Sequence, residues 1–312
     1  MIDRRQFLLA SGSCAAQVAL FSMAPPLLRS ALRQRNIDSV LMEPWARIER
    51  IGESVWACIS TPLSSDPEAR RTFSNGGIVA GRSGVLVIEG FASDAGAQWI
   101  AEQARGLTGR APTHVVLTHY HGDHSSGLAG YTRPIYVTTD ATRQRLATAR
   151  PPVAEVLAGA ELVESNTPRV IDLGGRRVTI TPRSGHTSSD LTVAVDDPAV
   201  VFGGDLVWNG MFPNYVDAIP TLLSPEVRAL SANTRAVIVP GHGAIPSREE
   251  FGRYLALLDF MEDTARRAHA AGRPPAEAAA GLALPAALGA WTMFSPKYFQ
   301  VALEAWERVL TP

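Results

Sequence analysis

The chain has 312 residues, of which 46% are hydrophobic, so it is long enough to bury a sizeable core in one large domain or two small ones. Its 29 Lys and Arg residues balance 30 Asp and Glu residues, and a net charge of -1 gives no electrostatic reason to expect a nucleic acid or an anionic membrane as partner. The two cysteines, Cys14 and Cys58, are too few for a thiolate zinc site, so any metal would be held mainly by imidazole and carboxylate groups.

The first 33 residues have the character of an export signal. Arg4 and Arg5 precede a mildly apolar run that ends near Phe21, which is typical of a twin-arginine signal. The run is too short and too polar for a membrane-spanning helix. We therefore predict that residues 1–33 are a twin-arginine export signal and linker, that the protein is periplasmic, and that no stable membrane insertion remains after signal removal. A cytosolic N-terminal helix with two accidental arginines is the alternative.

The next part of the chain alternates short β-branched runs with helical stretches. Ser93 and Asp94 begin a helix whose apolar residues follow helical spacing as far as Leu107. The run 114–118 has a continuous apolar centre, as expected of a strand that is covered on both faces. Strands are predicted at residues 56–59, 77–80, 85–88, 114–118, 134–139, 177–181, 191–195, 200–202 and 236–239. This pattern predicts an α/β or α+β layered domain over residues 34–250.

The pattern changes after Pro246. Helices are predicted at residues 251–271, 276–290 and 297–310, with a turn at 272–275. The simplest interpretation is that residues 251–312 form a helical extension packed on the same domain. The sequence leaves open a second interpretation, in which Trp291, Phe294 or Tyr298 forms a wall of the functional pocket.

Five of the seven histidines lie in three short polar breaks, each a few residues past an apolar strand. In the strongest break, Leu-Thr-His-Tyr-His-Gly-Asp-His, His119 and His121 project to the same side if the backbone stays extended. Asp123 and His124 follow in the turn that Gly122 permits. An isolated histidine is usually a satisfied polar group or a surface residue. Four ligand-type side chains within six residues instead indicate a binding site.

Two further breaks and one strand end carry the same kind of residue. His186 stands in Ser-Gly-His-Thr after the strand 177–181, and His242 stands in Pro-Gly-His-Gly after the strand 236–239. Between them, the strand 200–202 runs into Gly-Gly-Asp and so ends near the carboxylate of Asp205. Loops held at strand ends by a rigid sheet are where catalytic residues usually lie.

In this order, His-x-His-x-Asp-His, Gly-His-Thr, Gly-Gly-Asp and Pro-Gly-His-Gly resemble the motifs of the metallo-β-lactamase superfamily, over roughly residues 45–250. The resemblance implies an αβ/βα four-layer sandwich in which two similar halves pack their sheets together, with metals at one edge. It also implies a metal centre in which each ligand has an assigned place. The first metal takes His119, His121 and His186, the second takes Asp123, His124 and His242, and Asp205 bridges the two.

Imidazole and carboxylate ligands suit zinc, so two Zn²⁺ ions are expected, although manganese or iron accepts the same ligands. Two such cations acidify a shared water toward neutrality, and the hydroxide attacks a carbonyl. Asp123 is the expected catalytic residue, because it both binds metal and orients this nucleophile. Glu89 stands where the family usually has an aspartate that supports the metal loop. His114 and His269 are interpreted as a polar strand cap and a surface residue.

We therefore expect a hydrolase of a small-molecule ester, thioester, lactone or lactam. An aspartate at position 205 is the pattern of glyoxalase II-type thioesterases and lactonases, whereas familiar β-lactamases have cysteine or serine there. Residues 206–215 resemble exported metallohydrolases of sulfur-oxidation and quinoprotein systems, and Trp208, Phe212 and Tyr215 are candidate pocket residues. The alternatives are a β-lactamase proper, a mononuclear iron persulfide dioxygenase and a non-catalytic metal-binding protein. The complete ligand set argues against the last two.

Overall fold

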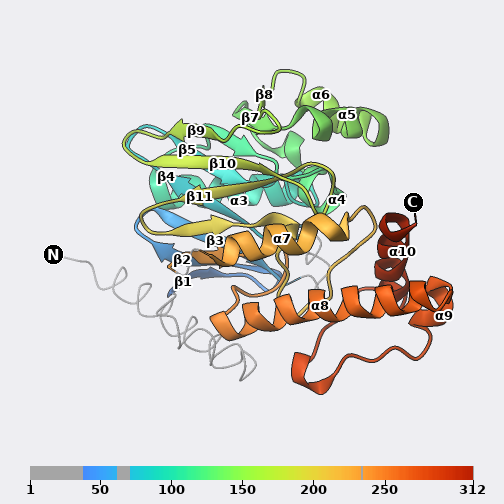
Figure 1. Cartoon of the computed structure of the whole chain (residues 1–312). Helices are drawn as coiled ribbons and strands as arrows, with labels where there is room; N and C mark the ends of the chain where they lie inside the picture. The colour runs from blue at the N-terminus through green and yellow to red at the C-terminus, as the bar shows by residue number, and fades with distance from the viewer. Residues whose placement is uncertain (1–37, 62–70, 233–234, 312) are drawn as a thin grey trace.

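The computed structural model describes residues 38–61, 71–232 and 235–311, and two β-sheets packed face to face form its centre (Figure 1). The predicted export signal at residues 1–33 lies outside the described residues. Within the described part of the chain, no helix combines the length and the apolar character needed to cross a bilayer.

The first sheet has eight strands that lie side by side in chain order, β1 to β8. Neighbours are antiparallel from β1 to β5 and parallel from β5 to β8. The strands are β1 (Asp38–Met42), β2 (Ala46–Gly52), β3 (Val55–Ser60), β4 (Gly76–Ala80), β5 (Val85–Ile88), β6 (His114–Val116), β7 (Ile135–Thr138) and β8 (Glu161–Leu162).

The second sheet has five strands in the order β13-β12-β11-β10-β9. All neighbours are antiparallel except β12 and β13, which are parallel and are joined through α7. The strands are β9 (Arg169–Asp172), β10 (Arg177–Arg183), β11 (Asp190–Val195), β12 (Val200–Phe202) and β13 (Val237–Val239).

Strand β3 illustrates how the sequence builds the layers. Its alternate residues Val55, Ala57 and Ile59 belong to the core between the two sheets, together with side chains of β10, β11 and β12. Trp56 and Cys58 point to the opposite face and pack in a second core with residues of α3. Both faces of the strand are therefore buried, which explains its continuous apolar sequence.

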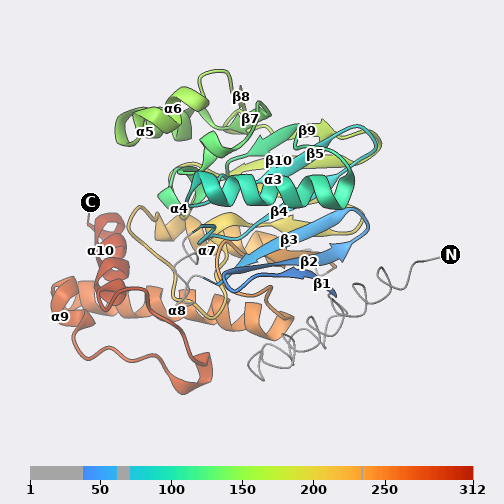
Figure 2. The same cartoon turned by 180° about the vertical axis from the view of Figure 1, so that it is seen from behind.

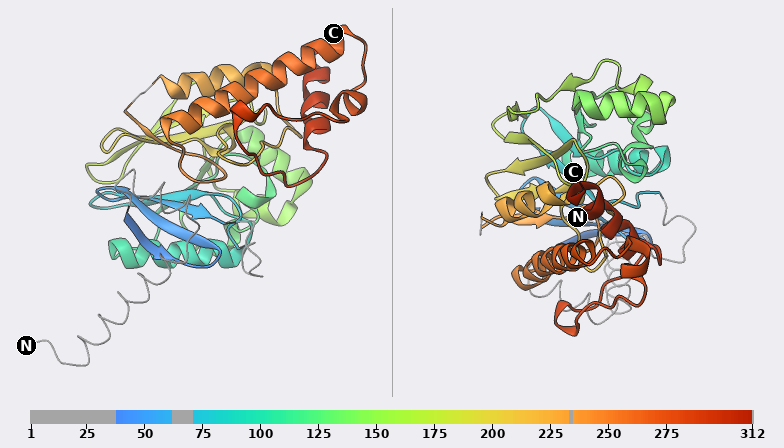
Figure 3. Two further views of the ribbon diagram at one scale, coloured as in Figure 1. Left: turned by 90° about the horizontal axis from the view of Figure 1, so that it is seen from below. Right: turned by 45° about the vertical axis from the view of Figure 1, so that its right-hand side comes forward.

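Helices cover the outer face of each sheet, and Figure 3 shows the resulting layers in order. The helices α3 (Asp94–Thr108), α5 (Asp140–Ala149) and α6 (Pro151–Val156) lie on the first sheet, as the view from behind shows for α3 (Figure 2). On the second sheet, α7 (Pro220–Ser231) and α8 (Arg248–Ala270) share a third core with Ile238 of β13, and α9 (Pro275–Ala279) and α10 (Tyr298–Leu310) join this core beside the sheet, packed against α8. This is the αβ/βα sandwich that the motifs predict. The domain limits at residues 34 and 250 stay predictions.

The structure corrects one predicted element and adds several. The predicted helix 276–290 is wrong, because α9 ends at Ala279 and only a short 3-10 turn follows at Ala286–Leu288. Gly281 has a φ of 74°, and Pro285 has no N–H to continue a helix. Strands β1, β2, β8 and β9 and helices α5 to α7 were not predicted. In β2 the reason is visible, because Arg47 and Glu49 are buried and pair with each other at 2.5 Å.

Candidate metal centre

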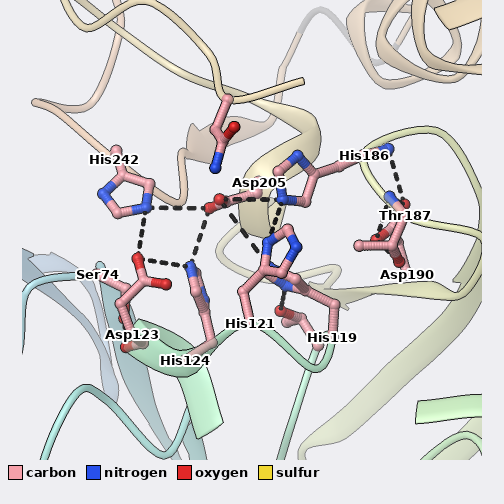
Figure 4. Close-up of polar contacts among 12 residues, drawn as sticks. Ser74, His119, His121, Asp123, His124, His186, Thr187, Asp190, Asp205 and His242 are labelled. Carbon is pink, nitrogen blue, oxygen red and sulfur yellow. Dashed lines mark hydrogen bonds and ion pairs between the residues drawn. The ribbon is translucent and has the colours of Figure 1, made fainter. Parts of the chain in front are cut away.

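The polar breaks singled out in the sequence meet at one edge of the two sheets, and Figure 4 shows their side chains converging. His119 and His121 follow β6, and Asp123 and His124 lie in the one-turn helix α4 (Gly122–Ser125). The other three side chains come from the second sheet: His186 from the turn between β10 and β11, Asp205 from the 3-10 turn after β12, and His242 from the loop after β13.

The first group is formed by His119, His121, His186 and Asp205, whose ligand atoms lie within 4.8 Å of one another. His186 Nε2 is 2.8 Å from His121 Nδ1 and 3.3 Å from Asp205 Oδ2. His119 Nε2 is 3.9 Å from the same carboxylate oxygen. Three imidazole nitrogens and one carboxylate oxygen thus point at a common centre, as ligands of a cation do.

The second group is formed by Asp123, His124 and His242, and its ligand atoms also lie within 4.8 Å of one another. Asp123 Oδ2 is 3.1 Å from His242 Nε2 and 3.6 Å from His124 Nε2. The other oxygen of Asp205, Oδ1, is 3.1 Å from His124 Nε2 and 3.4 Å from His242 Nε2. Each oxygen of Asp205 therefore faces a different group, which is the arrangement of a bridging carboxylate.

Several buried polar atoms of both groups make no hydrogen bond of good geometry in the described part of the chain, although carboxylate oxygens lie close to some of them. They are His119 Nε2, both ring nitrogens of His124 and of His242, and Asp205 Oδ1. Buried polar atoms are nearly always satisfied, because leaving one without a partner costs about 1–3 kcal/mol. Divalent cations would satisfy all of these except the nitrogens that point away from the centre. Imidazole with carboxylate is a ligand set that suits zinc.

The electrostatics of the two groups differ. Burial alone would lower the pKa of His242, but the carboxylates of Asp205 and Asp123 outweigh it and raise that pKa to about 9. The same competition raises the pKa of His124 well above its usual value. In the first group, burial with the neighbouring imidazoles lowers the pKa of His186 to about 3, against the effect of Asp205. The carboxylates of the second group therefore favour positive charge beside them. In the first group, His186 is neutral and offers a lone pair to a cation.

Glu89, the residue after β5, and Thr118, two residues after β6, orient the ligands. The Thr118 hydroxyl donates a 2.5 Å hydrogen bond to Glu89 Oε1, which itself lies 3.0 Å from His124 Nδ1. Because its proton is used in this way, Thr118 Oγ1 accepts from His119 Nδ1 at 3.0 Å, which leaves His119 Nε2 with a lone pair. Glu89 has a φ of 82°, a backbone conformation that is rare outside glycine and is often found at functional sites.

Asp217 is a functional residue that the sequence analysis missed. His121 Nε2 lies 3.0 Å from Asp217 Oδ2, so the ring donates to this carboxylate and keeps Nδ1 free of a proton. This hydrogen bond, against the effect of burial and with a further bond from Tyr120, lowers the pKa of Asp217 to about 2. The two partners are 96 residues apart, and no local pattern marks the aspartate.

Two more side chains that the sequence analysis missed hold the loops themselves. Asp190 accepts hydrogen bonds from the backbone N–H of His186 at 3.0 Å and from the Thr187 hydroxyl at 2.7 Å, which fixes the turn that carries His186. Asn75 donates to two carbonyls of the loop around His242, those of residues 240 and 243, at 2.9 and 2.7 Å. Asn75 lies 165 and 168 residues from these two partners, so no local pattern marks its role.

A cavity of about 330 Å³ opens onto the candidate metal centre. It is lined by His121, Asp123, Asp205 and His242, and by Phe73, Gly122, Trp208, Asn214, Phe294 and Tyr298. Trp208 stacks on His242 with ring centroids 4.1 Å apart. Of the other aromatic candidates, Phe212 and Tyr215 are buried in the core and Trp291 packs against Tyr254, so they do not line this cavity.

The two remaining histidines lie away from the centre, as interpreted from the sequence. His114 begins β6, and its Nδ1 is 2.8 Å from Thr113 Oγ1. His269 pairs with Glu307 at 3.0 Å between α8 and α10, where both side chains are partly exposed.

The sequence profile of the Metallo-beta-lactamase superfamily matches residues 69–242, which is more than half of the chain. The chain belongs to this superfamily. Because the superfamily consists of metal-dependent hydrolases, the protein is a metallohydrolase whose histidine and aspartate groups are suited to hold metal. Among curated proteins, none matches the chain significantly.

Several solved structures have the same fold. A metallo-β-lactamase from Pontibacter korlensis is 21% identical, with a TM-score of 0.57 over 69% of this chain and 99% of its own. One from Erythrobacter litoralis, with β-mercaptoethanol in its active site, is 20% identical, with a TM-score of 0.57 over 72% of this chain and 100% of its own. The inverting sec-alkylsulfatase Pisa1 from Pseudomonas sp. is 14% identical, with a TM-score of 0.68 over 85% of this chain and 50% of its own.

Proposed function

We propose that the protein is a dinuclear zinc hydrolase that attacks the carbonyl of a small ester, thioester, lactone or lactam in the periplasm. The observation that carries this proposal is Asp205, whose two oxygens face two separate groups of ligand-type side chains. His119, His121 and His186 would hold the first ion, and Asp123, His124 and His242 would hold the second.

Zinc ions at these places would supply a water of lowered pKa and polarise the substrate carbonyl. Asp123 is the most exposed of the seven side chains, at 26%, and it lines the cavity by which substrate arrives. The neighbouring imidazoles outweigh burial and lower its pKa to about 2, so it is a carboxylate at neutral pH. It can therefore accept a hydrogen bond from the attacking water and orient its lone pair toward the carbonyl.

Within the hydrolases, the aspartate at position 205 favours thioesters, lactones and esters over lactams. The structures of the same fold act on different bonds by their own descriptions, two as metallo-β-lactamases and one as an alkylsulfatase. The fold therefore does not determine the substrate, and our preference among the substrate classes rests on the pattern of ligand residues.

The test is the metal content of the purified protein, measured by mass spectrometry, together with hydrolysis of an ester, thioester, lactone and lactam panel. We expect about two zinc ions per chain and hydrolysis that a chelator abolishes. Asp123→Ala should lose activity, whereas Glu226→Gln, which removes a carboxylate paired with Arg183, should keep it. A single iron per chain without hydrolysis would overturn the proposal and favour oxygen consumption with persulfides.

Export is tested separately by fractionating cells that express the full chain. The protein should reach the periplasm, and replacing both Arg4 and Arg5 by lysine should retain it in the cytoplasm although the charge is unchanged. Periplasmic protein at the same level from the lysine variant would contradict the twin-arginine route.

A further inference from the structure

We propose that Phe73, Phe294 and Tyr298 form a binding wall for an aromatic or bulky apolar substituent of an uncharged substrate. We call these three side chains the aromatic wall. The inference rests on the proposed hydrolase function, because it assigns a substrate class to the same cavity.

The three rings line the cavity beside the candidate metal centre. Phe73 and Phe294 contact each other with ring centroids 5.4 Å apart and an interplanar angle of 35°. Their centroids lie 6.1 and 6.3 Å from that of His242, and Tyr298 lines the same cavity. A substituent held against these rings would therefore lie directly beside the proposed ligands.

The three rings of the aromatic wall are partly exposed at the cavity. Phe212, Tyr215 and Tyr254 of the adjoining core are fully buried, whereas the three rings of the aromatic wall are partly buried and line one cavity. Apolar side chains gathered around a concave functional site usually bind the apolar part of a ligand.

The C-terminal segment is tied in place by backbone hydrogen bonds. Thr292 N donates to the carbonyl of Gly210, and Phe212 N donates to the carbonyl of Thr292, both at 2.9 Å. This pairing joins the segment that carries Phe294 to the loop after Asp205. Phe294 and Tyr298 lie beyond residues 69–242, the part that matches the superfamily. Two of the three rings of the aromatic wall therefore come from the C-terminal segment, outside the part that matches the superfamily profile.

Size and charge define the ligand further. The cavity of about 330 Å³ is at the small end of the range for ligand pockets, which fits a single ring next to the reacting carbonyl. Among the described residues that line it, none is Lys or Arg, so apart from the proposed metal-binding groups no side chain there offers a positive charge to a substrate anion. A neutral ester, thioester or lactone with one phenyl-sized group matches these walls.

The experiment compares S-ethyl thioacetate with S-ethyl phenylthioacetate and S-benzyl thioacetate, followed by thiol release. For the wild type we expect kcat/KM to be about tenfold higher for at least one phenyl-bearing thioester. Phe294→Ala should reduce this ratio about tenfold, mainly through KM, and Phe294→Tyr should restore it. Leu222→Ala, an exposed position on α7, should leave the ratio unchanged.

Metal analysis and calorimetry separate the failure of this inference from the failure of the proposed function. If the protein holds zinc and hydrolyses all three thioesters equally well, the aromatic wall is refuted and the hydrolase stands. If it hydrolyses none, titration of N-benzylacetamide against N-ethylacetamide decides without catalysis. Tighter binding of the benzyl compound that Phe294→Ala abolishes supports the wall, and equal binding of both compounds overturns it.

Discussion

Replacing Asp217 tests whether a residue with no sequence signal controls the first metal group. In Asp217→Ala, His121 Nε2 loses its 3.0 Å hydrogen bond, so the ring can rotate and can carry its proton on Nδ1, the atom that faces His186. A carboxylate that orients a metal-binding histidine typically contributes a factor of 10–100 to metal affinity.

The structure places this case at the lower end of that range. The side chains of Asp217 and His121 are 30% and 15% exposed, so water screens part of the interaction. We expect Asp217→Ala to weaken zinc binding at the first group about tenfold, which corresponds to about 1.4 kcal/mol. Asp217→Asn keeps an acceptor without the charge, so its loss should be about threefold.

The assay is a competition titration of metal-free protein with zinc and a chromophoric chelator, with circular dichroism as a check of folding. Glu226→Gln is the matched control, because that carboxylate is also 30% exposed but pairs with Arg183. Its zinc affinities should stay within about twofold of the wild type. Wild-type affinity in Asp217→Ala, or an equal loss in the control, would refute the orienting role.

Four further substitutions test the loops that carry the ligands and helix α8. A Cβ at Gly241 would lie 2.0 Å from Asp205 Oδ1, so Gly241→Ala should abolish zinc binding. At Gly252 an added Cβ would have no other atom within 4 Å, so Gly252→Ala should stabilise α8 by about 0.5–1 kcal/mol. Metal analysis and urea unfolding measure both, and an unaltered zinc content in Gly241→Ala would contradict the first. Asn75→Ala removes two buried hydrogen bonds to the loop after β13 and should lower the free energy of unfolding by about 2–4 kcal/mol in urea. Burial raises the pKa of Asp190 from 3.8 to about 7, so the folded carboxyl stays protonated where the unfolded one ionises. The free energy of unfolding of metal-free wild type should therefore fall relative to that of Asp190→Asn as pH rises from about 4 to about 7. If the difference between the two proteins does not change with pH, the Asp190 carboxyl is ionised in the folded state and the prediction is wrong.

Much of the layered fold was predictable because burial on two faces imposes a local pattern. Strands β5 and β12 begin and end where their apolar runs do, and α3 begins after its Ser93 cap as predicted. Strand β2 was not predicted because its buried residues include Arg47 and Glu49. These two side chains form an ion pair with each other, which a local pattern of polarity cannot reveal. The helix predicted at 276–290 is wrong because the alanine-rich composition favours a helix, whereas Gly281 and Pro285 interrupt it.

The sequence by itself determined which side chains are candidate ligands and their order along the chain. Ligand chemistry belongs to the residue type, and a run such as 117–124 brings four such groups together by local spacing alone. Only the tertiary structure decided that Asp217 supports His121 and that Phe294 faces the cavity. These contacts join residues far apart in sequence, and they depend on how loops from two sheets meet at one edge, which no local pattern encodes.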